Sequence, residues 1–360
     1  MNGWESCMKT NFLPFLSLSF LGLVFSVIGY GQDTIAPIIA VIDTGVDLSH
    51  PCLESALWTN PGESGLDKNG KNRATNGVDD DNNGFIDDVH GWNFAEDNSS
   101  LLDQHGHGTH IAGIIACPMT EGPRPEVQMM ILKYFSVQAS APENLRHSIQ
   151  ALRYAIQMRA RMINYSSGGT GFNAEEFKTL QLAEKNEILV IAAAGNEHRN
   201  TDQIPYYPAS YALSNVLSVT SISSQKTLSP FSNFGPHSVH LAALGEDIIS
   251  LLPEKRFGTL SGTSQATARV THALVRLATQ EPWIHVPSEL IARLVVTGAF
   301  DSKLSKKTIS GKTLDLKRAL AMKDRLQSAL GEKIEYPPNI QEENLIVRAP
   351  SRRQINQQLQ

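Results

Sequence analysis

The chain has 360 residues, 41% of them apolar, which is enough to build a buried core in one large domain or two ordinary ones. Its 31 Lys and Arg against 36 Asp and Glu give a formal net charge of −5, which argues against nucleic acid as the main partner because such binding needs a basic face. The composition excludes disorder for the bulk of the chain, and three cysteines are too few for a disulfide-dense scaffold.

The first 31 residues predict a secretory signal peptide. A polar start that carries Lys9 precedes an apolar run over residues 12–29, and small residues stand at Gly29 and Gly31. We expect cleavage near Gly31, so that the mature protein is exported to the periplasm, the cell surface or the medium. The alternative is an uncleaved membrane anchor, which the run is barely long enough to provide. After cleavage we expect no contact with a membrane.

Short β-branched runs alternate with amphipathic segments from residue 38 onward, which is typical of a parallel sheet covered by helices. The predicted strands lie at residues 38–43, 129–135, 162–166, 188–193 and 216–222. The predicted helices lie at residues 142–161, 174–186, 264–279 and 288–297. We expect an α/β fold of three layers with a mostly parallel central sheet, and we expect its chemistry in loops at the strand ends. Residues 323–360 are polar and are expected to form a C-terminal tail.

Three short segments carry groups that nucleophilic catalysis needs. Asp43 ends a predicted strand in Val-Ile-Asp-Thr-Gly, His107 begins His-Gly-Thr-His, and Ser264 ends Ser-Gly-Thr-Ser at a predicted helix start. Each segment also has a structural reading, because a strand-end Asp and a Gly-Thr-Ser sequence are common helix entries. A match to any one of them alone is a weak signal.

Taken together, in the order Asp, His, Ser, these segments resemble the subtilisin-like serine proteases. The resemblance covers residues 36–322 and includes a fourth motif, Ala-Ala-Ala-Gly-Asn, which ends at Asn196. It implies a subtilisin-like peptidase domain over residues 32–322, in the three-layer α/β fold, that cleaves peptide or protein substrates through an acyl-enzyme. It implies no cofactor for catalysis. Because few residues lie between the expected cleavage point and Asp43, we expect the domain to fold without a prodomain.

The resemblance also assigns the catalytic roles. Ser264 is the nucleophile, His107 is the general base that takes its proton, and Asp43 holds the tautomer of His107 and stabilises the imidazolium. The side chain of Asn196 and the main-chain N–H of Ser264 form the oxyanion hole. The remaining histidines near these motifs are interpreted as structural or solvated: His50, His105 and His110.

Substrate binding follows from the same resemblance. An extended edge pairs with the substrate backbone and forms one wall of the pocket for the side chain before the scissile bond. The residues of this edge are Ser166, Ser167 and Gly168. The residues of the opposite wall are Ala193, Ala194 and Gly195. Small residues on both walls predict an open pocket for apolar side chains. Asp103 either faces the neighbouring subsite, where it favours basic residues, or is a solvated loop carboxylate.

Two cysteines remain after the leader, which contains Cys7, is removed. Cys52 stands where the family places an Asp ligand of a tight calcium site, and Cys117 ends the predicted helix after His107, beside the same site. The resemblance therefore implies a disulfide between Cys52 and Cys117 in place of a metal ion. The alternative is two unrelated buried thiols.

One acidic stretch predicts a structural calcium loop. Asp79, Asp81 and Asn83 match the first ligand positions of an EF-hand, but His90 stands where the last ligand, a Glu, is required. The stretch is therefore not an EF-hand, and we expect a different calcium site formed by Asp79, Asp81, Asn83 and Asp88. The alternative is an acidic, solvated insertion.

Two rival functions stay open at this point. One is an inactive relative that captures peptides in the same cleft, and the other is an esterase or acyl hydrolase that uses the same triad.

The sequence departs from the family at Gln265, where a Met usually follows the nucleophile, and this departure bears on substrate preference more than on activity. The sequence does not predict an oligomeric state.

Overall fold

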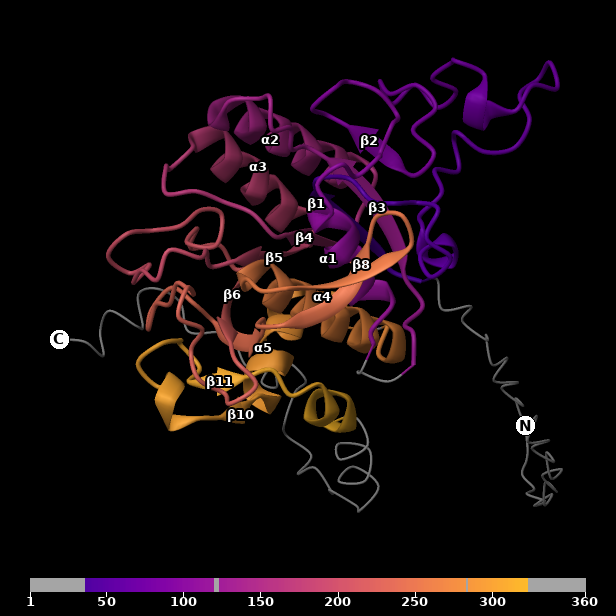
Figure 1. Cartoon of the computed structure of the whole chain (residues 1–360). Coiled ribbons are helices and arrows are strands. Elements are labelled where there is room, and N and C mark those ends of the chain that lie inside the picture. The colour runs from indigo at the N-terminus through magenta and orange to yellow at the C-terminus, as the bar shows by residue number, and fades with distance from the viewer. Residues whose placement is uncertain (1–35, 120–122, 283, 323–360) are drawn as a thin grey trace, which may run out of the picture. The chain divides into compact units, whose positions relative to one another are not determined.

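The computed structural model describes residues 36–119, 123–282 and 284–322 (Figure 1). The predicted signal peptide, residues 1–31, and the predicted tail, residues 323–360, lie outside these described residues. Within the described ranges, no helix combines the length and the apolar character that crossing a bilayer requires.

The strands of the described ranges are short, and most belong to one sheet. They are β1 (Ile38–Asp43), β2 (Gly91–Asn93), β3 (Gln128–Lys133), β4 (Met162–Tyr165), β5 (Leu189–Ala193), β6 (Val216–Ile222), β7 (Leu241–Leu244), β8 (Ile248–Leu252), β9 (Arg256–Leu260), β10 (Ala299–Phe300) and β11 (Lys312–Thr313). Among these residues, nine strands form a sheet in the order β10-β11-β7-β6-β5-β4-β1-β3-β2. Neighbouring strands are parallel except β10 and β11. β8 and β9 form a separate antiparallel hairpin.

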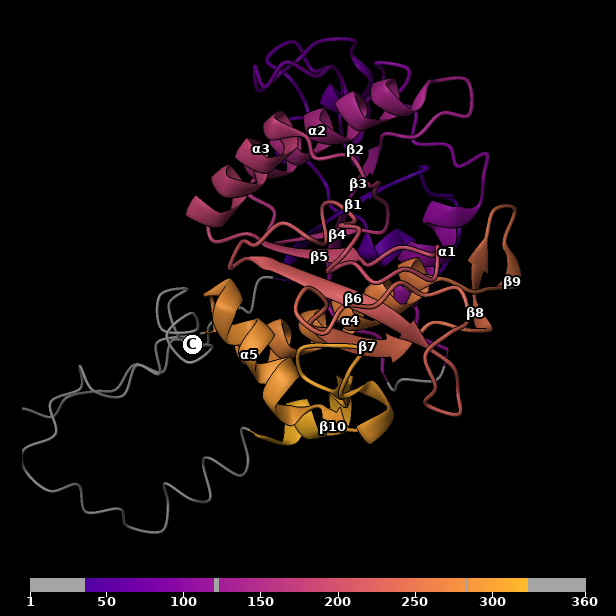
Figure 2. The same ribbon diagram turned by 90° about the vertical axis from the view of Figure 1, so that its left-hand side faces the viewer.

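The helices pack on both faces of this sheet. They are α1 (His107–Ala116), α2 (Ala141–Gln157), α3 (Ala174–Lys185), α4 (Thr263–Gln280) and α5 (Pro287–Thr297). Along β1, Ile39 and Val41 join the core beneath α1, α4 and α5, whereas Ala40 and Ile42 join the core beneath α2 and α3. Figure 2 shows α2 and α3 on one side of the sheet and α4 and α5 on the other. The predicted three-layer α/β fold is therefore confirmed.

The predicted elements differ from the structure mainly at their ends. Helix α2 begins with a capping box between Ser140 and Glu143 but ends at Gln157, four residues before the predicted end. It ends there because Arg159 adopts a left-handed backbone, with φ of 57°, as the chain turns toward β4. Six of the described strands were not predicted: β2, β7, β8, β9, β10 and β11. Of these, β2, β10 and β11 have only two or three residues, which are too few to show a periodic pattern.

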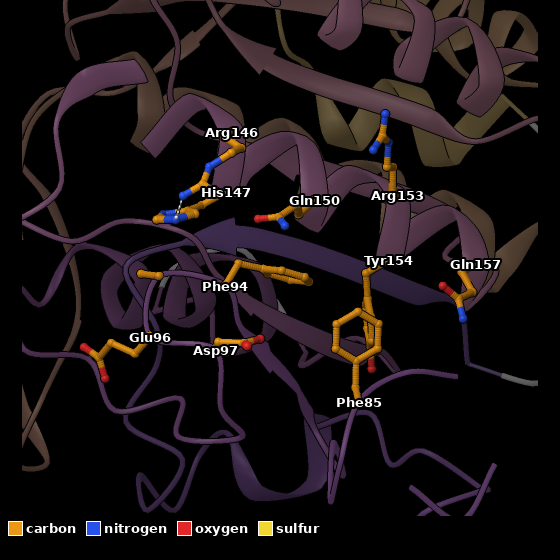
Figure 3. A pocket seen from close by; sticks show the side chains of 11 residues that line it. Phe85, Phe94, Glu96, Asp97, Arg146, His147, Gln150, Arg153, Tyr154 and Gln157 are labelled. Carbon is orange, nitrogen blue, oxygen red and sulfur yellow. Dashed lines mark hydrogen bonds between the residues drawn. The ribbon is translucent and has the colours of Figure 1, made fainter. Parts of the chain in front are cut away.

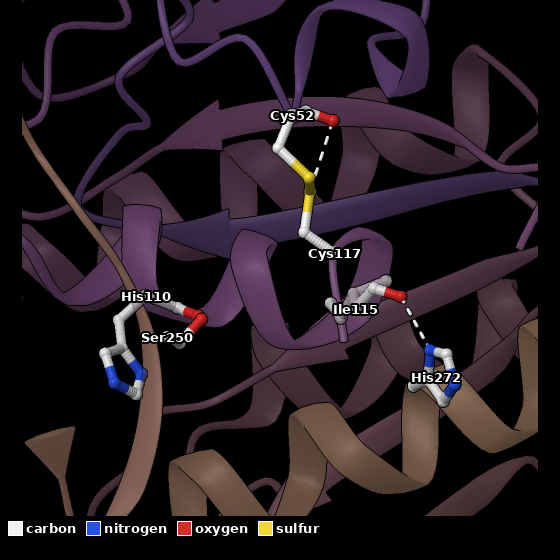
Figure 4. The surroundings of a disulfide bond; sticks show 6 residues. All are labelled: Cys52, His110, Ile115, Cys117, Ser250 and His272. Carbon is white, nitrogen blue, oxygen red and sulfur yellow. Dashed lines mark hydrogen bonds between the residues drawn. A yellow bond between two sulfur atoms is a disulfide. The ribbon is translucent and has the colours of Figure 1, made fainter. Parts of the chain in front are cut away.

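Helix α1 is fastened to the rest of the domain at several points (Figure 4). A disulfide joins Cys117, at the end of α1, to Cys52 in the segment after β1, with Cα atoms 6.2 Å apart. The hydroxyl of Ser250 donates to the main-chain oxygen of His110 at 2.8 Å, and the ring of His272 is 2.8 Å from another main-chain oxygen of α1. These contacts fix α1, and with it His107, against β8 and α4.

Candidate active site

The residues of the three motifs meet at the carboxyl edge of the sheet. Asp43 is the last residue of β1, His107 begins α1, and Ser264 lies in the first turn of α4. Nδ1 of His107 donates to Oδ1 of Asp43 at 2.7 Å, and the main-chain N–H of Thr44 donates to the same oxygen at 2.8 Å. Asp43 is only 3% exposed, so the imidazole is oriented by a carboxylate that water barely reaches.

Opposing effects act on the pKa of His107. Burial lowers this pKa because the imidazolium loses hydration, but the charge of Asp43, its hydrogen bond to the ring and the charge of Asp103 together outweigh burial. The pKa of His107 is therefore raised above its ordinary value. The neutral ring, which can accept a proton from a serine, dominates only above this raised pKa.

Asp103 does not face a substrate subsite, and both predictions made for it are wrong. Its side chain is 3% exposed and accepts hydrogen bonds through both oxygens. Oδ1 accepts from the hydroxyl of Thr44 at 2.9 Å and from the N–H groups of His105 and Gly106 at 3.0 and 2.8 Å. Oδ2 accepts from the N–H and the hydroxyl of Thr109 at 2.9 and 2.6 Å. Asp103 thus holds the turn into α1, where a negative charge also suits the helix dipole.

Thr44 was missed by sequence analysis, although it connects two of the motifs. Its hydroxyl donates to Asp103 and accepts from the N–H of Gly108, each at 2.9 Å. The end of β1 is thereby joined to the start of α1. The only sequence signal for this role was the position of Thr44 directly after Asp43 in the Asp-Thr-Gly motif.

Ser264 is buried, and its hydroxyl donates to the main-chain oxygen of Ser166 at 2.9 Å. The hydroxyl of Ser166 donates to the main-chain oxygen of Ser264 at 3.3 Å and accepts from Asn164 at 2.9 Å. Thr271, on α4, donates to Asn164 at 2.8 Å. Within the described chain, no hydrogen bond joins Ser264 to His107. The hydroxyl must therefore rotate before His107 can take its proton, and such bonds often form only with substrate in place.

Two N–H donors, from Asn196 and Ser264, border one space beside Gly262. The N–H and the hydroxyl of Thr263 donate to Oδ1 of Asn196 at 2.9 and 3.0 Å, which fixes the amide and leaves its Nδ2 free of these contacts. A Cβ on Gly262 would lie 3.7 Å from Asn196 Nδ2 and 3.7 Å from the main-chain N of Ser264. Glycine at this position therefore leaves open the space that both donors border. Oε1 of Gln265 lies 2.8 Å from the same point.

A free main-chain edge follows β4. The main-chain groups of Ser167 and Gly168 make no hydrogen bond to any residue in the described part of the chain. The edge ends at Gly169, which exchanges two main-chain hydrogen bonds with Tyr207 at 2.8 and 2.7 Å. The hydroxyl of Ser167 accepts a hydrogen bond from the hydroxyl of Tyr134 at 2.6 Å. Unpaired groups of this kind suit pairing with an extended peptide.

The opposite wall is held by a residue that sequence analysis did not single out, Asn233. Its side chain donates to the main-chain oxygen of Ala194 at 2.9 Å, and its N–H donates to that of Gly195 at 2.9 Å. Ala193 and Ala194 are buried, and Gly195 adopts a left-handed backbone with φ of 100°. The bonds from Asn233 therefore position the turn that carries Asn196.

The pocket between the two walls is not open, which corrects the prediction. The ring of Tyr206 lies between Gly168 and Gly195: its Cε1 would be 2.6 Å from a Cβ on the first glycine, and its Cδ2 3.0 Å from a Cβ on the second. These atoms stand on opposite edges of the ring, so the ring spans the space from wall to wall. Burial and the nearby charge of Glu197 raise the pKa of Tyr206 to about 12, which keeps its hydroxyl neutral.

Three of the four predicted calcium residues lie together, because the side-chain amide of Asn83 donates to Asp81 at 3.3 Å and to Asp88 at 2.8 Å. The carboxylate of Asp79 accepts from the main-chain N–H of Asn83 at 3.1 Å and of the next residue at 2.8 Å, so it caps a turn. Asp81 and Asp88 also lie with Glu63, and one oxygen from each of the three is within 4.8 Å of the others. Glu63 was missed because it precedes the acidic stretch in sequence. Burial raises the pKa of both Glu63 and Asp88.

The other histidines near the motifs take no part in this geometry. His110 is buried, and its Nε2 lies 2.9 Å from the main-chain oxygen of Ile248 in β8. His50 is buried against the ring of Phe257. His105 is exposed, with its ring centroid 6.3 Å from that of His107. These positions agree with structural or solvated roles.

A hollow of about 540 Å³ lies away from the triad, between α2 and the chain around β2 (Figure 3). Arg146 and Arg153 of α2 border it on one side, and Glu96 and Asp97 border it on the other. Neither the triad nor Asn196 lines this hollow. The candidate active site is therefore located by the hydrogen bonds of Asp43, His107, Ser264 and Asn196, and not by this hollow.

Comparison with known proteins decides the family. A sequence model of the subtilase family matches residues 35–325. This chain belongs to the subtilase family. It is 34% identical over 250 residues to the major intracellular serine protease of Bacillus subtilis, with 68% of each chain covered. It is 35% identical to the intracellular serine protease of Paenibacillus polymyxa, over 66% of this chain and 64% of the relative.

The fold of this subtilase also matches solved structures. A cold adapted subtilisin-like serine proteinase superposes with a TM-score of 0.59, at 23% identity, over 79% of this chain and 88% of the other. This similarity supports the α/β fold with a mostly parallel sheet. Through its family, the chain is a subtilisin-like serine-type peptidase, and its substrates are peptides or proteins.

Asp103→Asn tests the electrostatic control of His107. Asp103 is one of the charges that raise the pKa of His107, so its loss lowers that pKa and extends the neutral ring to lower pH. We expect the acidic limb of the kcat/KM profile to move to lower pH in this variant, measured on a chromogenic peptide after circular dichroism has confirmed folding. Asp97→Asn, which removes an exposed carboxylate, is the control and should leave the limb in place. A limb that stays or moves to higher pH in Asp103→Asn contradicts the assignment.

Proposed function

We propose that this subtilase hydrolyses peptide bonds with Ser264 as nucleophile, His107 as general base and Asp43 as the residue that orients the imidazole. The 2.7 Å hydrogen bond between Asp43 and His107 carries this proposal. The buried Ser264 and the two N–H donors that border the space at Gly262 support it. The Ser264 hydroxyl turns from Ser166 toward His107, which accepts its proton as Oγ bonds to the substrate carbonyl carbon. His107 then gives the proton to the leaving amine. Water repeats the sequence on the acyl-enzyme.

The oxyanion is stabilised by the Asn196 side chain and the main-chain N–H of Ser264. Thr263 already occupies Oδ1 of Asn196 with two hydrogen bonds, so the Nδ2 donor is held in place before any charge develops. A donor that does not need to reorient lowers the barrier more than a mobile one does. Gly262 leaves the space beside both donors open.

Small side chains are the preferred residues before the scissile bond. The walls at Ser167 and Gly168 and at Gly195 would admit a large side chain, but the Tyr206 ring lies between them. Fitting an aromatic side chain into the same space requires the ring to move. The free edge at Ser167 and Gly168 binds the substrate main chain and adds affinity with little sequence preference.

The mature protein is exported. The predicted leader and the disulfide between Cys52 and Cys117 support this, because disulfides persist in oxidising compartments. Both relatives compared above are named intracellular proteases, so export would distinguish this chain from them. N-terminal sequencing of the protein outside the cytoplasm should start near Gln32. A chain that keeps Met1 and stays in the cytoplasm contradicts export.

Ser264→Ala tests the proposed chemistry. We expect wild-type protein to degrade casein and to react with a fluorophosphonate, and the variant to lose turnover by on the order of 10⁶-fold and to take up no label. Asn196→Ala keeps the nucleophile but removes one oxyanion donor, which should cost about 2.7–4 kcal/mol, or roughly 10²–10³ in kcat. Casein turnover by Ser264→Ala at the wild-type rate contradicts the mechanism.

The same assay separates the rival functions. Saturable peptide binding by the wild-type chain without turnover would identify an inactive relative, in agreement with the resting contact between Ser264 and Ser166. Turnover of esters without turnover of peptides would identify an acyl hydrolase.

Tyr206→Ala tests the proposed pocket. Removing the ring should raise kcat/KM for peptides with Phe before the scissile bond, relative to those with Ala, by at least about tenfold. Paired synthetic peptides that differ only at this residue measure the ratio. Ile204→Ala truncates an exposed side chain two positions before Tyr206 in the chain and should leave the ratio unchanged. An unchanged ratio in Tyr206→Ala would show that the ring does not limit the pocket.

A further inference from the structure

Gln265, the residue after the proposed nucleophile, borders the oxyanion space but takes no part in the triad. It is the third residue of α4, and its side chain is 2% exposed. Its Oε1 lies 2.8 Å from the point that a Cβ on Gly262 would occupy. The same point is 3.7 Å from Asn196 Nδ2 and 3.7 Å from the main-chain N of Ser264. Three polar groups therefore border the open face of this glycine, and two of them are donors.

The amide of Gln265 has no protein partner that fixes its orientation. It makes no hydrogen bond to any residue in the described part of the chain, whereas Oδ1 of Asn196 is held by two bonds from Thr263. A buried amide without a partner is costly, and such groups usually contact water or a ligand. The end of this amide faces the space beside Gly262, which the substrate oxygen enters during the proposed reaction.

The two ends of the Gln265 amide have opposite effects on an oxyanion. A carbonyl oxygen beside two N–H donors is favourable in the substrate-free enzyme, but it repels an oxygen that gains negative charge in the same space. Nε2 carries two N–H groups and attracts that charge. The two ends are nearly equal in size, and the last torsion of a glutamine side chain is broad and roughly two-fold. A half-turn of the amide therefore replaces Oε1 by Nε2 with little change in packing.

We propose that Gln265 is a further catalytic residue, whose Nε2 donates to the oxyanion beside Asn196 and the Ser264 N–H. The inference rests on the proposed function, because it needs the tetrahedral intermediate on Ser264. The amide turns as charge develops, and no bond forms or breaks beyond those of the peptidase reaction. A donor that must reorient stabilises charge less than one held in place, so Gln265 contributes less than Asn196. The dipole of α4 favours negative charge at the same end of the helix.

Gln265→Leu tests this role in the full chain, because leucine removes the amide and keeps an apolar stem of similar length. We expect kcat on a chromogenic peptide to fall about tenfold with little change in KM, since the contact forms only with the oxyanion. Gln265→Glu should lose more, because a carboxylate adds negative charge beside the oxyanion. Gln280→Leu, at the exposed end of the same helix, is the matched control and should keep the wild-type kcat.

A transition-state analogue separates this role from packing. A peptidyl trifluoromethyl ketone forms a tetrahedral adduct with an oxyanion on the serine, so its Ki should rise about tenfold in Gln265→Leu. Ser264→Ala measures ground-state binding of the same peptide without reaction. Adding Gln265→Leu to Ser264→Ala should leave the Kd of that peptide unchanged. A side chain that only fills space would instead weaken the binding of the analogue and of the peptide alike.

Either of two results would overturn the inference. One is a kcat and a Ki within about twofold of the wild-type values in Gln265→Leu, and the other is equal weakening of analogue and peptide binding. If the leucine variant does not fold, Gln265→Met decides in the same way. Wild-type protein that neither cleaves peptides nor reacts with a fluorophosphonate contradicts the proposed function as well. An active wild type with either of the two results contradicts the role of Gln265 alone.

Discussion

The parallel pairing of β1, β4 and β5 brings the carboxyl ends of these strands to one edge, and every contact of the catalytic site depends on it. Asp43 ends β1, the free edge at Ser167 follows β4, and the turn to Asn196 follows β5. A parallel sheet of this kind must be covered on both faces. Coverage by α1 and α4 places their first turns, with His107 and Ser264, beside the same edge.

Hydrogen bonds from small polar residues then fix the positions of the segments that meet at this edge. Thr44 bonds to Asp103, which holds the turn into α1, and Thr263 bonds to Asn196. Hydroxyl groups therefore fix both the segment that carries His107 and the amide of Asn196. Asn164 and Thr271 extend the same network beneath Ser166. Buried polar groups of this kind are costly unless they are fully bonded, and their mutual satisfaction keeps the site rigid.

The sequence predicted the residues that stand in catalytic motifs, but it did not predict the residues whose positions depend on tertiary packing. Asp43, His107, Ser264 and Asn196 stand in motifs whose order and flanks are distinctive. The position of the Tyr206 ring depends on how two loops from distant parts of the chain meet, and no local pattern encodes that. Asp103 was misjudged for a related reason, since a loop carboxylate looks solvated until its five donors are known.

The acidic segment at residues 79–88 also shows that local sequence patterns do not predict contacts between distant segments. The alternation of Asp79, Asp81 and Asn83 predicted a calcium loop, because ligand spacing is a local property. The third carboxylate of the cluster, Glu63, comes from a separate turn and joins the others only through the fold. The fold class and the strands β1, β3, β4, β5 and β6 were predictable because they depend on repeated apolar patterns, whereas β7, the hairpin of β8 and β9, and the strands of two or three residues were not.

The central claim is that Ser264 attacks the substrate while Asn196 and the Ser264 N–H hold the resulting oxyanion. The most direct test is a crystal structure of the enzyme with a peptidyl phosphonate. The account predicts a bond from Ser264 Oγ to phosphorus, a phosphonyl oxygen about 2.7–3.1 Å from both donors, and His107 within hydrogen-bond reach of the Ser264 oxygen. An adduct on another residue, or an oxygen directed to solvent with neither donor in contact, would contradict it.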